Sequence, residues 1–253
     1  MLKMQKRITS KHVAILFCLV ICFVSCAHKS GHRRDRERPG TTMADCSNGK
    51  SSRSTARKSK IVNKRSSNKL EGSQIFDRYG SAVFMVFTTD GSNTYQGSGF
   101  FIDNGGLAVS NYHVFKGTGM GLEQIKLAGS DVAYKVTEII TRSEDEDFIL
   151  FRVDCENNNY IPIATEKPKI GEKVYAIGSP RGLENTFSSG EVSQWRADNL
   201  MQISALIDHG SSGGALINEY GEVVGITSGS FADGSQANLN YAWSIDIVKP
   251  YLR

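Results

Sequence analysis

Residues 208–217 read DHGSSGGALI, a serine placed between glycines and followed directly by an apolar run. Glycines leave no side chains around Ser212, so a substrate backbone could approach closely and backbone N–H groups could point at a developing oxyanion. Gly-Ser runs also form ordinary turns, so this run alone predicts little. It indicates acyl transfer by Ser212 only if a base and a carboxylate accompany it.

The same run fits the GxSxG nucleophile elbow of α/β hydrolases, in which an acidic residue and then a histidine follow the serine. All the histidines of this chain precede Ser212: His12, His28, His32, His113 and His209. No base is therefore available in that order. The order His, Asp, Ser stays open.

Two further segments fit that order. Residues 97–117, GSGFFIDNGGLAVSNYHVFKG, hold two strand-like runs around an Asn-Gly-Gly turn, and His113 lies at the end of the second run. Residues 144–153, EDEDFILFRV, pass from an acidic cluster into an apolar strand, and Asp147 is the last acidic residue before it. Each feature alone is usually structural or solvated. Together, at edges between strands and loops, they predict a Ser-His-Asp triad.

These motifs resemble those of trypsin-like serine endopeptidases of the chymotrypsin fold, specifically the bacterial HtrA/DegP-type branch. The similarity covers most of residues 74–253. The shared segments are GSGFFID, SNYHV, DFILFRV, VYAIGSP, TFSSGEVS, GSSGG, GEVVGI and NYAWSIDIVKPYL. The resemblance implies an all-β fold of two packed six-stranded β-barrels with a short C-terminal helix. It also implies an endopeptidase that acts on proteins or peptides and needs no cofactor and no metal.

Carried over residue by residue, the resemblance makes Ser212 the nucleophile and His113 the general base and then acid. Asp147 orients the imidazole and stabilises its charged form. The backbone N–H groups of Gly210 and Ser212 form the oxyanion hole.

Asp147 is preferred over Asp145 and Asp154 because it immediately precedes the apolar strand, as the family's carboxylate does. The chain departs from the HtrA pattern at Ser211, where asparagine is usual, and at His209, where proline is usual. Neither departure removes a catalytic group. We interpret His209 mainly as a loop residue, with contact to substrate as the alternative.

The substrate pocket is expected to be uncharged, because Leu206 stands where trypsin has the aspartate that selects Lys or Arg. Small or aliphatic side chains would suit it. Such pockets discriminate weakly, by about 1–3 kcal/mol per methylene, so a narrow preference is not predicted. The predicted pocket residues are Leu206, Ile207, Ser228, Gly229, Ser230 and Tyr241.

Residues 70–253 read as one protease domain with mostly short, β-branched and aromatic runs separated by Gly, Asn or Ser turns. Three such runs are residues 82–87, 173–177 and 222–226. Only residues 74–79 and 245–252 have helical patterning. We place the boundary between the barrels near residues 165–170. The chain ends just after the last helical segment, so we expect no PDZ domain. A homo-oligomer is expected only from the resemblance to the family.

Residues 1–26 predict a signal peptide, with four basic residues before a twelve-residue apolar run. That run is short for the ~30 Å of a membrane core, which disfavours a retained membrane helix. The sequence FVSC resembles a bacterial lipobox and would make Cys26 the lipidated first residue. Ordinary cleavage after Ala27, giving a secreted protein, is the alternative.

Residues 27–69 carry 13 Lys/Arg against three acids and almost no apolar side chains, which predicts a disordered basic linker. Residues 70–253 instead have a net charge of −10. The linker suits an anionic membrane surface. Nucleic-acid binding is not expected, because no aromatic binding face accompanies the charges.

Only Cys155 of the five cysteines lies in the predicted domain, so internal disulfides are not available to stabilise it. The sequence therefore indicates an exported serine endopeptidase of a bacterial cell envelope, on the periplasmic or the surface side of the membrane. The rival interpretation is a catalytically silent binding or chaperone module with the same fold.

Overall fold

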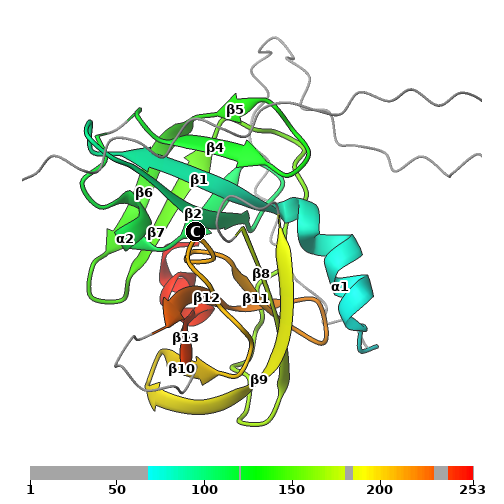
Figure 1. Cartoon of the computed structure of the whole chain (residues 1–253). Helices are drawn as coiled ribbons and strands as arrows, with labels where there is room; N and C mark the ends of the chain where they lie inside the picture. Colours follow the sequence, from blue (N-terminus) through cyan, green and yellow to red (C-terminus); the bar gives the residue numbers. More distant parts are fainter. Residues whose placement is uncertain (1–67, 120, 180–184, 231–238, 253) are drawn as a thin grey trace, which may run out of the picture. The chain divides into compact units, whose positions relative to one another are not determined.

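The computed structural model describes residues 68–119, 121–179, 185–230 and 239–252. The predicted signal peptide, Cys26 and nearly all of the basic linker lie outside these residues. Within the described ranges, no helix has the length and apolar character needed to cross a membrane. Figure 1 shows a predominantly β structure, with one sheet in cyan and green and a barrel in yellow to red.

The first half of the domain forms a seven-stranded antiparallel sheet in the order β5-β4-β1-β2-β3-β7-β6. Its strands are β1 (Val83–Thr89), β2 (Thr94–Phe101), β3 (Leu107–Ser110), β4 (Gln124–Leu127), β5 (Ala133–Tyr134), β6 (Val136–Ser143) and β7 (Phe148–Val153). The two edge strands are consecutive in the chain, since only Lys135 separates β5 from β6. The first half is therefore an open sheet of seven strands, where the sequence predicts a six-stranded barrel.

The second half is a closed six-stranded barrel, as expected, in the order β10-β13-β12-β11-β8-β9. Its strands are β8 (Lys173–Gly178), β9 (Thr186–Ala197), β10 (Leu200–Ile203), β11 (Ala215–Asn218), β12 (Val223–Ser230) and β13 (Asn240–Ser244). The predicted all-β class of the chymotrypsin type is therefore confirmed, with one closed barrel and one open seven-stranded sheet.

Helices are short and lie at the edges of the two sheets. The predicted helix at 74–79 is α1 (Gly72–Tyr79), followed by the 3₁₀ turn η1 (Gly80–Ala82), and a four-residue helix α2 (Tyr112–Phe115) carries His113. The predicted helix at 245–252 is instead two 3₁₀ turns, η3 (Ile245–Ile247) and η4 (Lys249–Tyr251). Pro250 has no N–H to donate in an α-helical ladder, so the backbone closes i→i+3 bonds on either side of it.

Strands β1, β7 and β8 bury both faces, which explains why their sequences are nearly continuous apolar runs. Along β7, Phe148 and Leu150 point toward the second barrel, whereas Ile149 and Phe151 point into the first sheet. Along β8, Tyr175 and Ile177 face the first sheet, while Val174 and Ala176 fill the second barrel. Three cores result, one inside each half and one between them. We call the last the interbarrel core.

Helix α1 precedes the first sheet in the chain but packs against the second barrel, beside β8 and β9 (Figure 1). The ring of Phe76 meets Phe187 edge-on at 6.0 Å between centroids, and Phe187 stacks on Tyr175 at 5.5 Å. The buried side chain of Ile75 enters the interbarrel core. The helix therefore binds the two halves of the domain together.

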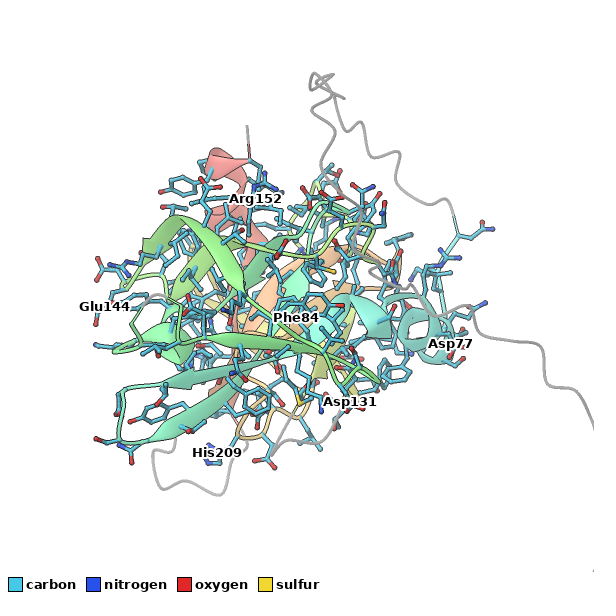
Figure 2. The ribbon with its side chains drawn as sticks, turned by 90° about the horizontal axis from the view of Figure 1, so that it is seen from above. Asp77, Phe84, Asp131, Glu144, Arg152 and His209 are labelled. Atoms are coloured by element: carbon cyan, nitrogen blue, oxygen red, sulfur yellow. The ribbon has the colours of Figure 1, made fainter. Side chains whose placement is uncertain are left out.

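In the GSG motif of β2, as along β7 and β8, successive residues face opposite halves of the domain. A Cβ on Gly97 would lie 2.6 Å from Val114 Cγ1, and one on Gly99 would lie 2.4 Å from Phe84 Cε2. Phe84 lies in the interior of the molecule in Figure 2, whereas Glu144 and His209 lie at its periphery. Both glycines make room for side chains of the first half of the domain, Val114 of α2 and Phe84 of β1, and Ser98 between them faces the other way.

Gly99→Ala is expected to lower the free energy of unfolding by about 1–3 kcal/mol, because the added methyl group overpacks the fully buried Phe84 ring. Urea denaturation followed by fluorescence measures the change. Gly119→Ala is the matched control, since a Cβ there meets only Leu122 Cδ1 at an ordinary 3.4 Å. Equal stability of the two variants would contradict the packing assigned to the motif.

Candidate active site

His113 and Asp147 form a paired acid–base unit beside the end of β3 and the start of β7. The imidazole Nδ1 lies 2.8 Å from Asp147 Oδ2 and 3.0 Å from Oδ1, and the His113 backbone N–H donates to Oδ1 at 2.9 Å. The imidazole is 45% exposed, whereas the carboxylate is 17% exposed. With Nδ1 held by the carboxylate, Nε2 is the nitrogen left to exchange a proton with a nucleophile or substrate.

Asp147 is fixed by contacts from both halves of the domain. Asn111 Nδ2 donates to the Asp147 backbone carbonyl at 2.8 Å, and Ser228 Oγ donates to Asp147 Oδ2 at 2.8 Å. The Asp147 backbone has φ 46°, a left-handed conformation that is uncommon outside glycine. Asp145 and Asp154 are exposed and make no hydrogen bond to His113. The carboxylate preferred from sequence is the one that contacts the histidine.

Sequence reasoning missed the roles of Asn111 and Ser228. Ser228 was expected in the pocket wall, but the β12–β13 register shifts between Thr227 and Gly229. This irregularity leaves Ser228 outside the regular ladder, and bulges of this kind re-aim side chains. Its partner Asp147 is 81 residues away in the chain, which no local pattern reveals. Asn111 stands directly before α2, where asparagine is favoured, but its side chain makes no capping hydrogen bond, so this preference does not reveal its contact with Asp147.

Ser212 lies in a tight turn that only glycines can build. Gly210 and Gly213 have φ 93° and 87°, in the region where side chains are strained. A Cβ on Gly213 would lie 2.2 Å from the Ser98 backbone oxygen. The Gly213 N–H donates to Thr227 O at 2.7 Å, which ties the turn to β12.

The two predicted oxyanion donors are available for a ligand. In the part of the chain that the structure describes, neither the Gly210 N–H nor the Ser212 N–H donates a hydrogen bond. The intervening N–H, of Ser211, is used by Asp208 O at 2.9 Å. The turn thus leaves unpaired the two N–H groups that the family resemblance selects.

Consecutive residues of β12 contact both the carboxylate and the serine. Ser228 binds Asp147, and a Cβ on Gly229 would lie 3.6 Å from Ser212 Oγ. Strand β12 therefore passes close to both Asp147 and Ser212 Oγ. Among the described residues no hydrogen bond joins Ser212 Oγ to His113 Nε2. Catalytic hydrogen bonds are often long in structures without substrate and shorten when it binds.

The predicted pocket residues are brought together only in part. Leu206 is 66% exposed, so it does not form an enclosed floor, and Ile207 belongs to the core inside the second barrel. Tyr241 is half-buried and pairs with Gly229 in the β12–β13 ladder. Ser230 pairs with Asn240, and its side chain lies outside the described atoms.

His209 is exposed at the periphery (Figure 2). Its backbone N–H donates to Asp208 Oδ1 at 2.7 Å, a local side-chain contact typical of turns. This contact supports the interpretation of His209 as a loop residue. No cluster of three or more His, Cys, Asp or Glu side chains able to hold a metal occurs among the described residues.

Comparison with known proteins agrees with this geometry. A sequence model of the trypsin-like peptidase domain matches residues 97–226, half of the chain. A probable periplasmic serine endoprotease DegP-like of Halomonas elongata is 32% identical over 161 residues, covering 60% of this chain and 33% of the relative. Protease Do-like 1, chloroplastic, of Arabidopsis thaliana is 28% identical over 180 residues, covering 64% of this chain and 40% of the relative.

Among solved structures, the serine endoprotease of Yersinia pestis is similar, with a TM-score of 0.64 and 26% sequence identity over 71% of this chain and 64% of that one. The chain spans between about a third and a little over half of the length of the curated relatives that it matches first. The resemblance to HtrA/DegP-type proteins indicated by the motifs is confirmed. The fold, the arrangement of His113, Asp147 and Ser212, and these comparisons lead to one conclusion: the chain belongs to the trypsin-like peptidase family.

Proposed function

We propose that this chain is a serine endopeptidase that hydrolyses peptide bonds of protein substrates through an acyl-enzyme on Ser212. The observation that carries the proposal is the path of β12, where Ser228 donates to Asp147 and a Cβ on the next residue, Gly229, would lie 3.6 Å from Ser212 Oγ. The two N–H groups without partners in the adjacent turn support it, because acyl transfer needs donors for an oxyanion.

Acylation begins when Ser212 Oγ attacks the carbonyl carbon of the scissile bond while its proton passes to His113 Nε2. The carbonyl oxygen becomes an oxyanion between the N–H groups of Gly210 and Ser212. Asp147 stabilises the imidazolium that forms. The C–N bond then breaks, His113 gives the proton to the departing amine, and an ester with Ser212 remains.

Deacylation repeats these steps with water. His113 Nε2 takes a proton from the water as its oxygen attacks the ester carbonyl, and the oxyanion forms between the same donors. The bond to Ser212 Oγ breaks, Oγ recovers the proton from His113, and the carboxylic acid leaves. Each oxyanion donor contributes about 10²–10³-fold to such rates, so the turn matters as much as the side chains.

Ser212→Ala is expected to abolish labelling of the full chain by a fluorophosphonate probe and to lower cleavage of an unfolded protein by at least about 10⁴-fold, because the nucleophile is lost. Gel fluorescence and a cleavage assay measure both. Ser193→Ala, which removes another exposed serine from β9, should change neither. Absence of labelling and of cleavage in the unmodified protein would favour the silent binding module.

Ser228→Ala is expected to lower kcat by about 10-fold with little change in KM, because Asp147 loses a hydroxyl donor but keeps His113. Asp147→Asn should lower kcat much more, by about 10⁴-fold. Steady-state kinetics on a peptide substrate measure both variants. A loss for Ser228→Ala that appears only in KM would assign Ser228 to substrate binding instead.

For location, we propose export and attachment to the cell envelope through lipidated Cys26 and the basic linker. The 13 Lys/Arg of residues 27–69 support attachment, since each cation near an anionic membrane contributes about 1 kcal/mol. Similar proteins named as periplasmic occur in Halomonas elongata and Rhizobium meliloti, which supports export.

Mass spectrometry of the mature N-terminus is expected to find a diacylglyceryl group on Cys26, and Cys26→Ser should release the protein from the membrane fraction. Cys46→Ser, a change inside the linker, is the matched control and should leave the protein in that fraction. A mature protein that begins at His28 and carries no lipid would show ordinary cleavage and secretion.

A further inference from the structure

Ser98 is a fully buried serine at the centre of the contact between the two halves of the domain. It lies in β2, between the two glycines that make room for Val114 and Phe84, and its side chain faces the second barrel. A hydroxyl at such a position must find partners, because an unpaired buried polar group is unfavourable. The partners that it has are informative.

The Ser98 hydroxyl makes two hydrogen bonds. It donates to the Gly210 carbonyl oxygen at 2.7 Å and accepts from the Ser179 N–H at 2.8 Å. The backbone of the same residue makes two more, since its N–H donates to Ser212 O at 2.8 Å and its carbonyl accepts from Ser110 Oγ at 2.7 Å. Three of these four partners belong to the second half of the domain.

We propose that Ser98 is a positioning residue that sets the orientation of the turn from Gly210 to Gly213. We call this turn, which carries the two predicted N–H donors, the oxyanion turn. The two carbonyls that it holds, of Gly210 and Ser212, lie on either side of the peptide that carries the Ser212 N–H. Gly210 has φ 93° and no side chain to restrict its rotation. Fixing its carbonyl limits the rotation of the turn that carries both N–H donors. This role rests on the proposed function of that turn.

The alternative is that Ser98 serves folding alone. Two features argue for the more specific role. The Ser98 Oγ atom, which belongs to the first half of the domain, binds both Gly210 O and the Ser179 N–H. It therefore sets the distance between two loops of the second barrel. Replacing it by a methyl group would leave a carbonyl and an N–H unpaired next to Gly210, where the backbone can turn to satisfy them.

Ser98→Ala is expected to lower kcat on a peptide substrate by about 10–100-fold with KM within about twofold, since the donors act mainly in the transition state. Affinity for a peptide boronic acid, which mimics the tetrahedral intermediate, should fall by the same factor as kcat/KM. Ser98→Thr keeps the hydroxyl and should restore most of the rate. Ser98→Cys, with a weaker donor, should be intermediate and replaces Ser98→Ala if that variant does not fold.

Thr88→Val is the matched control, because Thr88 is buried and its hydroxyl donates to a different backbone carbonyl, of Val114, at 2.8 Å. It should lower stability without lowering boronic-acid affinity. If Ser98→Ala loses no more kcat than Thr88→Val, or if its loss is confined to KM, the positioning role is wrong.

A measurement that needs no turnover separates this inference from the proposed function. In ¹⁵N-labelled full chain, the amide resonances of Gly210 and Ser212 should shift or broaden in Ser98→Ala and stay unchanged in Thr88→Val. An unmodified protein that neither cleaves nor reacts with fluorophosphonate would overturn the proposed function alone. Unchanged amide resonances in Ser98→Ala would overturn the positioning role even in an active enzyme.

Discussion

Burial of apolar side chains between the two halves of the domain is the interaction on which the candidate site depends. His113 and Asp147 come from the first half of the domain and Ser212 from the second, so their distances are set by how the interbarrel core packs. That core is apolar and does not by itself define a unique alignment. Two buried or half-buried serines, Ser98 and Ser228, add directional hydrogen bonds across it. Packing brings the halves together, and these hydroxyls orient them.

The sequence was sufficient to predict mostly β structure from short apolar runs bounded by Gly, Asn and Ser turns, and the resemblance to trypsin-like proteases implied its arrangement in two halves. It was also sufficient to select His113 and Asp147, which hydrogen bonds join in the structure, since each stands at the boundary between a recognisable run and a loop. The C-terminal segment was misread as a helix because its apolar spacing outweighed Pro250. The break at Lys135 depends on pairing with two different strands, which no local pattern encodes.

The remaining differences concern contacts between segments distant in the chain. Ser228 was expected in the pocket wall, and its hydroxyl also contacts Asp147, because a strand irregularity decides where it points. The pocket was inferred from the resemblance to trypsin-like proteases, yet Leu206 is 66% exposed. Spacing identifies which residues approach a site, whereas tertiary pairing decides which face they present.

The attachment of α1 to the second barrel also has a mechanical consequence. The chain enters the described domain through Leu70, whose N–H donates to Glu219 O at 2.7 Å, and through Lys69, which pairs with the same residue's carboxylate at 2.6 Å. A pulling force on the chain before Asn68 would first load these bonds and the packing of Phe76 on Phe187. The load would enter the half that holds Ser212 and leave the strands around His113 unstretched. The attachment of α1 therefore keeps tension on the linker from displacing His113 and Asp147.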